Sequence, residues 1–205
     1  MTLAHDTTAQ NIALRQWGIP ECLHVPVAAV DEDALEKYVG KIVQTLSGKP
    51  HRRAFLIEIP EPPVRDARLP IWNVEGSEIF FSNLQVWVDV SYTPYRKAYQ
   101  RGFPEEDIRG KVLSHCLNRR TAALKGYQFV RGTITTRGAN SSSAFSENWG
   151  VDRYEKMEKS FKERRQGAHI QYADLTDLML MLDIKLGGGI MDVVNEGQKL
   201  IKPTR

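Results

Sequence analysis

The run 84–91 constrains the fold of this chain more than any other segment. Its residues alternate between two faces, one wholly apolar and one mostly polar: Leu84, Val86, Val88 and Val90, against Gln85, Trp87, Asp89 and Ser91. A period of two residues is typical of a β-strand. Gly126 then ends a basic helical stretch, and a second strand is expected over 128–135. A carboxylate on a strand that lies close to basic helices suits a site that handles phosphate.

The bulk composition favours an ordinary soluble protein. With 205 residues, of which 41% are hydrophobic, the chain can form one generous domain, or a domain with an extension, around a real core. No run approaches the roughly 18 apolar residues that span a bilayer, and the N-terminal residues lack the pattern of a secretory signal. Two cysteines do not make a disulfide framework. We therefore expect a cytoplasmic protein that does not enter a membrane.

The charge is concentrated in one block. Residues 93–139 contain ten lysines and arginines and three acids, a net charge of +7, which leaves −4 for the rest of the +3 chain. A basic block on a nearly neutral protein indicates a surface that binds a polyanion. A solvated surface paired with the acidic remainder is the alternative. Three tyrosines in or beside the block could stack bases or form half-buried core: Tyr92, Tyr95 and Tyr99.

The hydrophobic periodicity predicts an α/β or α+β fold. We expect helices over 31–48 and 105–125 with a short one after Thr93, and strands over 54–59, 77–82, 84–90 and 128–135. Three further helices should begin near Asp152, Asp174 and Ile190. The predicted architecture is a mixed central sheet flanked by helices over 1–138. An α-helical extension over 139–205 should pack on this core or on a partner.

The order of these elements resembles the core of a known nuclease superfamily. With the short helix after Thr93 counted as an insertion, residues 31–135 read as helix, strand, strand, strand, helix, strand, an order similar to that of the restriction-endonuclease-like, or PD-(D/E)xK, nucleases. The run VWVDVS is similar to the strand that carries the second acid of that motif. NRRTAALKGYQFVRG is similar to the helix and strand that follow it. The resemblance implies a restriction-endonuclease-like core, a DNA or RNA partner and a Mg²⁺ cofactor.

The resemblance also implies roles for particular residues. Such enzymes hold Mg²⁺ with carboxylates, and a lysine two residues after the second acid stabilises the developing charge. Asp89 matches the second acid, and Glu78 is expected to supply the first, so that the two together bind the metal. Ser91 stands where the lysine should be, and Lys97 would have to supply that charge from the next helix. Two other carboxylates are alternatives for completing the site: Glu75 and Glu36.

Two functional hypotheses follow from this pattern. One is a Mg²⁺-dependent nuclease with Glu78, Asp89 and Lys97 as catalytic residues. The other is a catalytically degenerate subunit that binds nucleic acid or acts as a scaffold in a homo-oligomer or a larger assembly. Both share the same expected nucleic-acid contacts: Arg96, Lys97, Arg101, His115, Arg119 and Arg120. For His115 two other readings stay open, a packed histidine at the rim of the core and the general base of a His-Asn metal nuclease.

Overall fold

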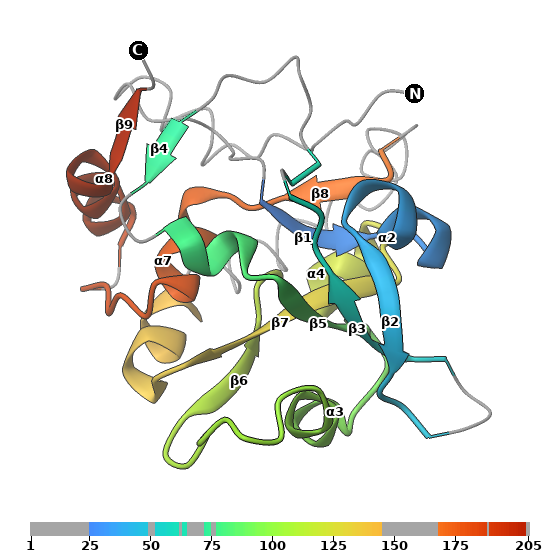
Figure 1. The fold of residues 1–205 in the computed structure, drawn as a ribbon. Helices are drawn as coiled ribbons and strands as arrows, with labels where there is room; N and C mark the ends of the chain where they lie inside the picture. The colour runs from blue at the N-terminus through green and yellow to red at the C-terminus, as the bar shows by residue number, and fades with distance from the viewer. Residues whose placement is uncertain are drawn as a thin grey trace.

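One curled sheet organises the chain in the computed structural model, which describes residues 25–48, 52–61, 63–64, 72–74, 77–144, 168–187 and 189–203 (Figure 1). The strands are β1 (Pro26–Ala29), β2 (Lys41–Thr45), β3 (Ala54–Glu58), β4 (Trp72–Val74), β5 (Leu84–Asp89), β6 (Val112–His115), β7 (Phe129–Thr135), β8 (Ile170–Tyr172) and β9 (Ile201–Pro203). The helices are α2 (Glu32–Tyr38), the 3-10 helix η1 (Ser77–Phe81), α3 (Tyr95–Gly102), α4 (Arg119–Leu124), α7 (Leu175–Met181) and α8 (Ile190–Leu200), and residues 137–144 are helical as well. Among the described helices, none is long and apolar enough to cross a membrane.

The strand order of the main sheet is β2-β3-β5-β7-β1-β8, and β6 pairs with the part of β7 that extends beyond β1. Every described pairing is antiparallel. The expected mixed sheet is therefore wrong for these strands. The chain leaves β5 through α3 and then forms β6 and α4, so it enters β7 in the direction opposite to β5. β4 and β9 form a separate two-stranded ladder.

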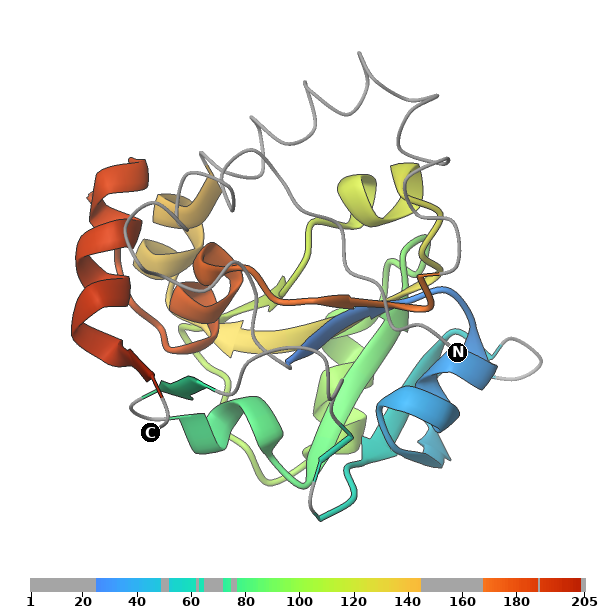
Figure 2. The ribbon, with the colours of Figure 1, turned by 90° about the horizontal axis from the view of Figure 1, so that it is seen from above.

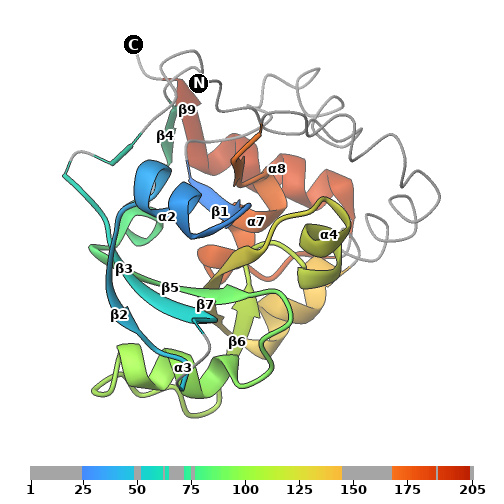
Figure 3. The same cartoon turned by 90° about the vertical axis from the view of Figure 1, so that its right-hand side faces the viewer.

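Helices cover both faces of the sheet (Figures 2 and 3). α3 and α4 pack on the face that carries Val86 and Val88, whereas α2 packs on the face that carries Trp87. α7 and α8 build a third apolar cluster with the start of β1 and with η1. The predicted alternation of β5 is confirmed, but neither face of this central strand meets solvent: Gln85 and Asp89 are buried, with 4% and 8% of their surface exposed.

The expected helix over 31–48 is wrong in its second half. α2 begins at its cap Asp31, whose carboxylate accepts from the Ala34 N–H at 2.8 Å, and it ends at Tyr38. At Gly40 the backbone passes so close to β3 that a Cβ atom would clash with the Glu58 carbonyl oxygen. The chain then forms the edge strand β2. The apolar residues in this stretch fit a helical stripe equally well, so spacing alone did not separate the two outcomes.

The expected helix over 105–125 is wrong in its first part, and only Arg119–Leu124 is helical. Gly110 has a positive φ of 74°, which breaks the helix, and residues Val112–His115 pair with β7 as β6. Asn118 then caps the short helix α4, accepting from the N–H groups of Arg120 and Thr121. Gly126, with a φ of 77°, ends this helix as the sequence predicted.

The segment after residue 138 adds to the first sheet as well as to the helices. β8, which the sequence pattern did not predict, pairs with β1, and the predicted helices α7 and α8 are confirmed. The segment over 139–205, expected to be α-helical, therefore also contributes a strand to the main sheet. The expected strand over 77–82 is instead the 3-10 helix η1. Two expected features lie outside the described residues: Glu75 and the helix near Asp152.

Candidate functional site

Asp89 closes a turn at the end of β5. Its Oδ1 accepts hydrogen bonds from the Ser91 N–H at 2.8 Å and from the Ser91 hydroxyl at 2.5 Å, and its Oδ2 accepts one from Gln128 Nε2 at 3.3 Å. The Tyr92 N–H donates to the Asp89 carbonyl at 2.9 Å. A carboxylate that accepts from the N–H two residues further on forms an Asx turn, which fixes the backbone locally. We name residues 89–92 the Ser91 turn.

Hydrogen bonds from protein donors already hold the Asp89 carboxylate, the expected Mg²⁺ ligand, in one orientation. Mg²⁺ requires oxygen ligands in near-ideal octahedral geometry, and both oxygens of Asp89 already accept hydrogen bonds from protein donors. Within the described part of the chain, no group of three His, Cys, Asp or Glu side chains is placed to hold a metal ion. The residue at the expected lysine position, Ser91, completes the turn and supplies no positive charge.

The other two residues of the expected catalytic trio lie away from Asp89. Glu78 belongs to η1, and its side chain lies outside the described ones. η1 packs at the beginning of β5, where Gln85 Nε2 donates to the Phe80 carbonyl at 3.1 Å. Gln85 precedes Asp89 by four residues, or about 13 Å of strand. Lys97 is exposed on α3, which packs on the opposite face of β5.

Two arginines from distant segments flank the Ser91 turn. Arg53, just before β3, donates from Nη1 to Ser91 Oγ at 3.4 Å. Arg119, the first residue of α4, donates from Nη1 to the carbonyls of Tyr92 at 3.3 Å and Val90 at 3.5 Å. Figure 3 shows α4 and the end of β5 on the same side of the molecule. Sequence reasoning missed Arg53; its only signal was a pair of arginines directly before a predicted strand.

An aromatic ring links Arg119 to His115. The Arg119 guanidinium lies 5.0 Å from the centre of the Tyr95 ring, and the His115 ring meets Tyr95 edge-on at a centroid distance of 4.6 Å. Burial, assisted by the charge of Arg119, lowers the pKa of His115 to about 3. The imidazole is therefore neutral near pH 7. Such a weak base suits neither a phosphate-binding cation nor a general base, and it fits the reading of a packed histidine at the rim of the core.

Four cations of the basic block donate hydrogen bonds to other parts of the protein, two of them buried (Lys125 and Arg131), one half-buried (Arg96) and one exposed (Arg101). Arg96, Arg101 and Arg131 donate to backbone carbonyl oxygens at 2.6–2.9 Å. Lys125 donates to Gln171 Oε1 at 3.3 Å and is buried. Two of the expected nucleic-acid contacts, Arg96 and Arg101, thus connect backbone segments to each other. The net charge of the block overstates the charge that a ligand could meet.

Two cations that contact the Ser91 turn, Arg53 and Arg119, and the neighbouring Arg120 on the first turn of α4 define a smaller surface. Arg53 and Arg120 are exposed, and Arg119 is half-buried. Tyr92 and Tyr95 are half-buried among them. We name Arg53, Arg119 and Arg120 the cationic surface. It combines guanidinium groups with aromatic rings that come from the turn and the start of α3.

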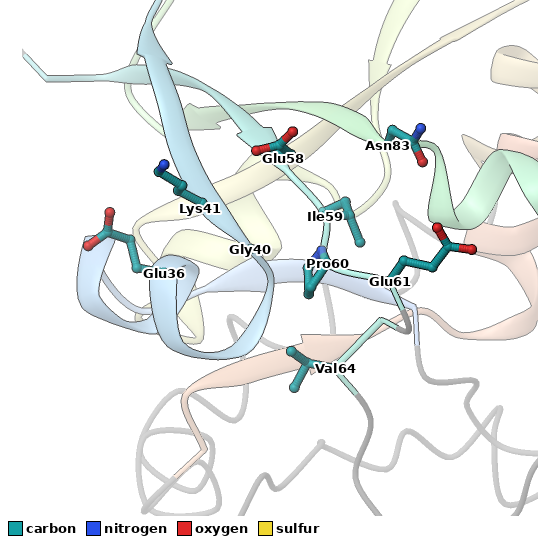
Figure 4. A pocket seen from close by; sticks show the side chains of 9 residues that line it. All are labelled: Glu36, Gly40, Lys41, Glu58, Ile59, Pro60, Glu61, Val64 and Asn83. Carbon is teal, nitrogen blue, oxygen red and sulfur yellow. The ribbon is translucent and has the colours of Figure 1, made fainter.

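A broad hollow of about 570 Å³ at the start of β5 has the opposite charge (Figure 4). Glu36, Glu58 and Glu61 line it together with Lys41, which leaves it negative. Figure 4 shows Glu36 and Glu61 at opposite sides of the hollow, with Glu58 between them, so that the three carboxylates do not converge. Glu36, the expected helical carboxylate, therefore lies in this hollow and away from Asp89. A hollow of this charge repels phosphates.

Comparison of this chain with known protein families, with curated proteins and with solved structures found no match. The resemblance to restriction-endonuclease-like proteins is therefore neither supported nor contradicted by a relative. We therefore infer a function from the geometry of the Ser91 turn.

Proposed function

We propose that this protein binds nucleic acid through the cationic surface around the Ser91 turn, as a binding or scaffolding component on a nuclease-like fold without nuclease activity of its own. The observation that carries the proposal is the bonding of Asp89. Its carboxylate accepts three hydrogen bonds within the turn and with Gln128, in the place where an active relative would hold a metal. A residue committed to the backbone in this way supports a structural role.

The chemistry of the cationic surface supports a phosphate-bearing partner. Guanidinium groups bind phosphate oxygens with two N–H donors at once. Arg119 uses Nη1 for the turn carbonyls among the described contacts, which leaves Nη2 and Nε as further donors. Tyr95 offers a ring that already stacks with a guanidinium. Aromatic rings beside cations are typical of surfaces that bind single-stranded nucleic acid, where bases stack and the cations contact the backbone.

The direct test is binding as a function of salt. Labelled single-stranded DNA, duplex DNA and RNA are titrated with the full chain and with a variant that carries Arg53→Ala, Arg119→Ala and Arg120→Ala, and binding is followed by fluorescence anisotropy. Each phosphate that is no longer bound by an arginine should reduce the slope of log K against log salt by about 0.7–0.9. The triple variant should therefore bind all sequences more weakly, with a slope shallower by about 2–3.

A matched control removes the same charge elsewhere. Arg137→Ala, Lys185→Ala and Lys199→Ala replace three exposed cations that lie beyond the far end of β7 or on α8 and its preceding loop. Equal slopes for the two triple variants would refute the cationic surface as the binding site. Incubation of the same nucleic acids with Mg²⁺ or Mn²⁺ tests the enzyme hypothesis. Cleavage that disappears in Asp89→Asn would overturn the non-catalytic part of the proposal.

A further inference from the structure

A second concavity lies in the sheet itself, where β5 and β7 part. The register pairs Val86 with Gly132, and beyond this point β7 continues with β6 alone. A pocket of about 280 Å³ lies in this gap. It is lined by η1, the start of β5, the end of β7, α3 and the loop that follows α3. The pocket lies at the opposite end of β5 from the Ser91 turn. We name it the Arg131 pocket.

Arg131 brings a buried positive charge to this pocket. Only 5% of its surface is exposed, and its guanidinium donates to the carbonyls of Phe80 at 2.6 Å and Ile79 at 2.9 Å. Burial lowers the pKa of Arg131, but an arginine side chain stays protonated in proteins. Among the described residues, no carboxylate forms an ion pair with it. A buried cation held only by carbonyl dipoles gains strongly from an anionic counter-charge.

The polar groups at the mouth add to this preference. Lys111 is exposed and lines the pocket together with Glu106. The Glu106 carboxylate accepts a hydrogen bond from the Tyr99 hydroxyl at 3.0 Å. Burial and the charge of Glu106 raise the pKa of Tyr99. The phenol therefore stays protonated and donates a hydrogen bond to Glu106. The pocket thus contains two cations, Arg131 and Lys111, and one carboxylate, Glu106, which already accepts a hydrogen bond. Its net charge is positive.

Part of the pocket wall is apolar. Phe103 and Ile134 are half-buried along it, and Ile79 has 42% of its surface exposed at its edge. Thr133 contributes a buried hydroxyl. The volume lies just below the usual range for ligand pockets, about 300–1,000 Å³, so only a small molecule fits. The lining suits a ligand with one charged end and a compact apolar body.

We propose that the Arg131 pocket binds a small organic anion, whose carboxylate or phosphate group pairs with Arg131 and Lys111 while its apolar body packs against Phe103 and Ile134. This site is independent of the proposed nucleic-acid surface. The two use different residues at opposite ends of β5, so the failure of one proposal leaves the other intact.

Calorimetric titration of the full chain with four probes tests the proposal. Phenyl phosphate and benzoate represent the two possible anionic groups on the same body, inorganic phosphate represents the anion without a body, and benzamide the body without a charge. We expect saturable one-to-one binding of phenyl phosphate, benzoate or both. Inorganic phosphate should bind more weakly, and benzamide should not bind measurably. The ratio between the first two probes identifies the preferred anion.

Charge reversal at the mouth supplies the matched pair of variants. Lys111→Glu should weaken binding of the anionic probe by about three- to tenfold, because it replaces an attractive rim charge with a repulsive one. Arg109→Glu makes the same change two residues away, on an exposed side chain that does not line the pocket, and should leave the affinity within about twofold. Both positions are exposed, so the fold should tolerate both changes.

Three results would overturn the proposal. The first is an absence of saturable binding by either organic anion. The second is equal weakening by Lys111→Glu and Arg109→Glu, which would show that the anions respond to overall charge. The third is equal affinity for benzamide and benzoate, which would remove the role of Arg131. Direct replacement of Arg131 is a poorer test because this side chain also anchors η1.

Discussion

The two ends of β5 use arginine in different ways. At the Ser91 turn, Arg53 and Arg119 contact an exposed loop from outside, and their guanidinium groups stay close to the surface. At the Arg131 pocket, one guanidinium lies inside the protein and holds the carbonyls of η1. Arg119 and Arg131 belong to the same basic block of the sequence. Their surroundings in the fold, and not their spacing along the chain, decide whether each stabilises the protein or is presented to a partner.

These two environments set an order of expected energies. A buried cation has lost its hydration, so its protein contacts are costly to remove. A surface cation keeps most of its water, and its removal changes long-range attraction more than stability. Substitutions at the Arg131 end should therefore appear in unfolding experiments. At the Ser91 end, substitution of Asp89 should lower the stability of the protein. Substitution of the arginines there should weaken the binding of nucleic acid.

The largest effect is expected for Arg131→Met. The substitution removes the Arg131 donor from the carbonyls of Ile79 and Phe80, of which Phe80 keeps only the bond from Gln85, and each buried group that loses a partner costs about 1–3 kcal/mol. We expect a loss of about 3 kcal/mol in the free energy of unfolding, measured by urea denaturation. A loss below about 0.5 kcal/mol, the level of an ordinary surface substitution, would show that Arg131 is not part of the packed interior and that the two ends of β5 do not differ in this way.

Asp89→Ala comes next, with an expected loss of about 2 kcal/mol in the free energy of unfolding, since each hydrogen bond to a charged group contributes about 1.5–3 kcal/mol before rearrangement. The alanine leaves the Ser91 N–H and the Gln128 amide without their acceptor. The period-two pattern of β5 places Asp89 on a mostly polar face, and on an exposed polar face this truncation would cost little. Urea denaturation of Asp89→Ala and Asp89→Asn tests whether Asp89 stabilises the turn. The asparagine keeps an acceptor oxygen, so Asp89→Asn should lose less stability than Asp89→Ala.

The sequence predicted three neighbouring inner strands of the sheet but missed the inner strand β1 and the outer strands β2, β6 and β8. β3, β5 and β7, as well as α3, α7 and α8, follow from alternation and helical stripes. β2 and β6 were taken for helix because their apolar residues fit both periods. The decisive facts were tertiary: the close approach at Gly40 and the pairing of β6 with β7. A strand three residues long, such as β8, carries too little pattern to be read.

The functional roles of the expected site residues stay predictions, but the fold brings two of these residues together. Asp89 and Arg119 do meet at one turn, as a phosphate-handling site would require. Burial of Arg131 and Lys125 could not be read from the chain, because it depends on which strand lies next to β7 and on η1 above it. Arg53 reaches the turn only through the pairing of β3 with β5.

The His115 ring gives the next prediction, through pH. Its pKa of about 3 in the folded protein lies below the ordinary value of about 6.5 expected in the unfolded chain. The unfolded state therefore binds the proton first, and stability, complete above about pH 6.5, falls as the pH drops towards 3. At a pH of about 5 the loss should reach about 2 kcal/mol. His115→Phe keeps a ring against Tyr95, and urea denaturation should show a flatter pH profile for this variant; a profile as steep as that of the wild type would exclude His115 as the cause.

The smallest expected effect on stability belongs to Arg120→Ala, and this variant separates the two ends of β5 most clearly. Arg120 is exposed beside Arg119 on the first turn of α4, so its truncation should change the free energy of unfolding by no more than about 0.5 kcal/mol. If it contacts a phosphate, the slope of log K against log salt should fall by about 0.7–0.9 in the same variant. Arg131→Met should show the reverse, a large loss of stability with an unchanged salt slope among the molecules that remain folded. Urea denaturation and anisotropy titrations on the two variants measure both quantities, and a shared change in either one would mean that the two ends of β5 are not functionally distinct.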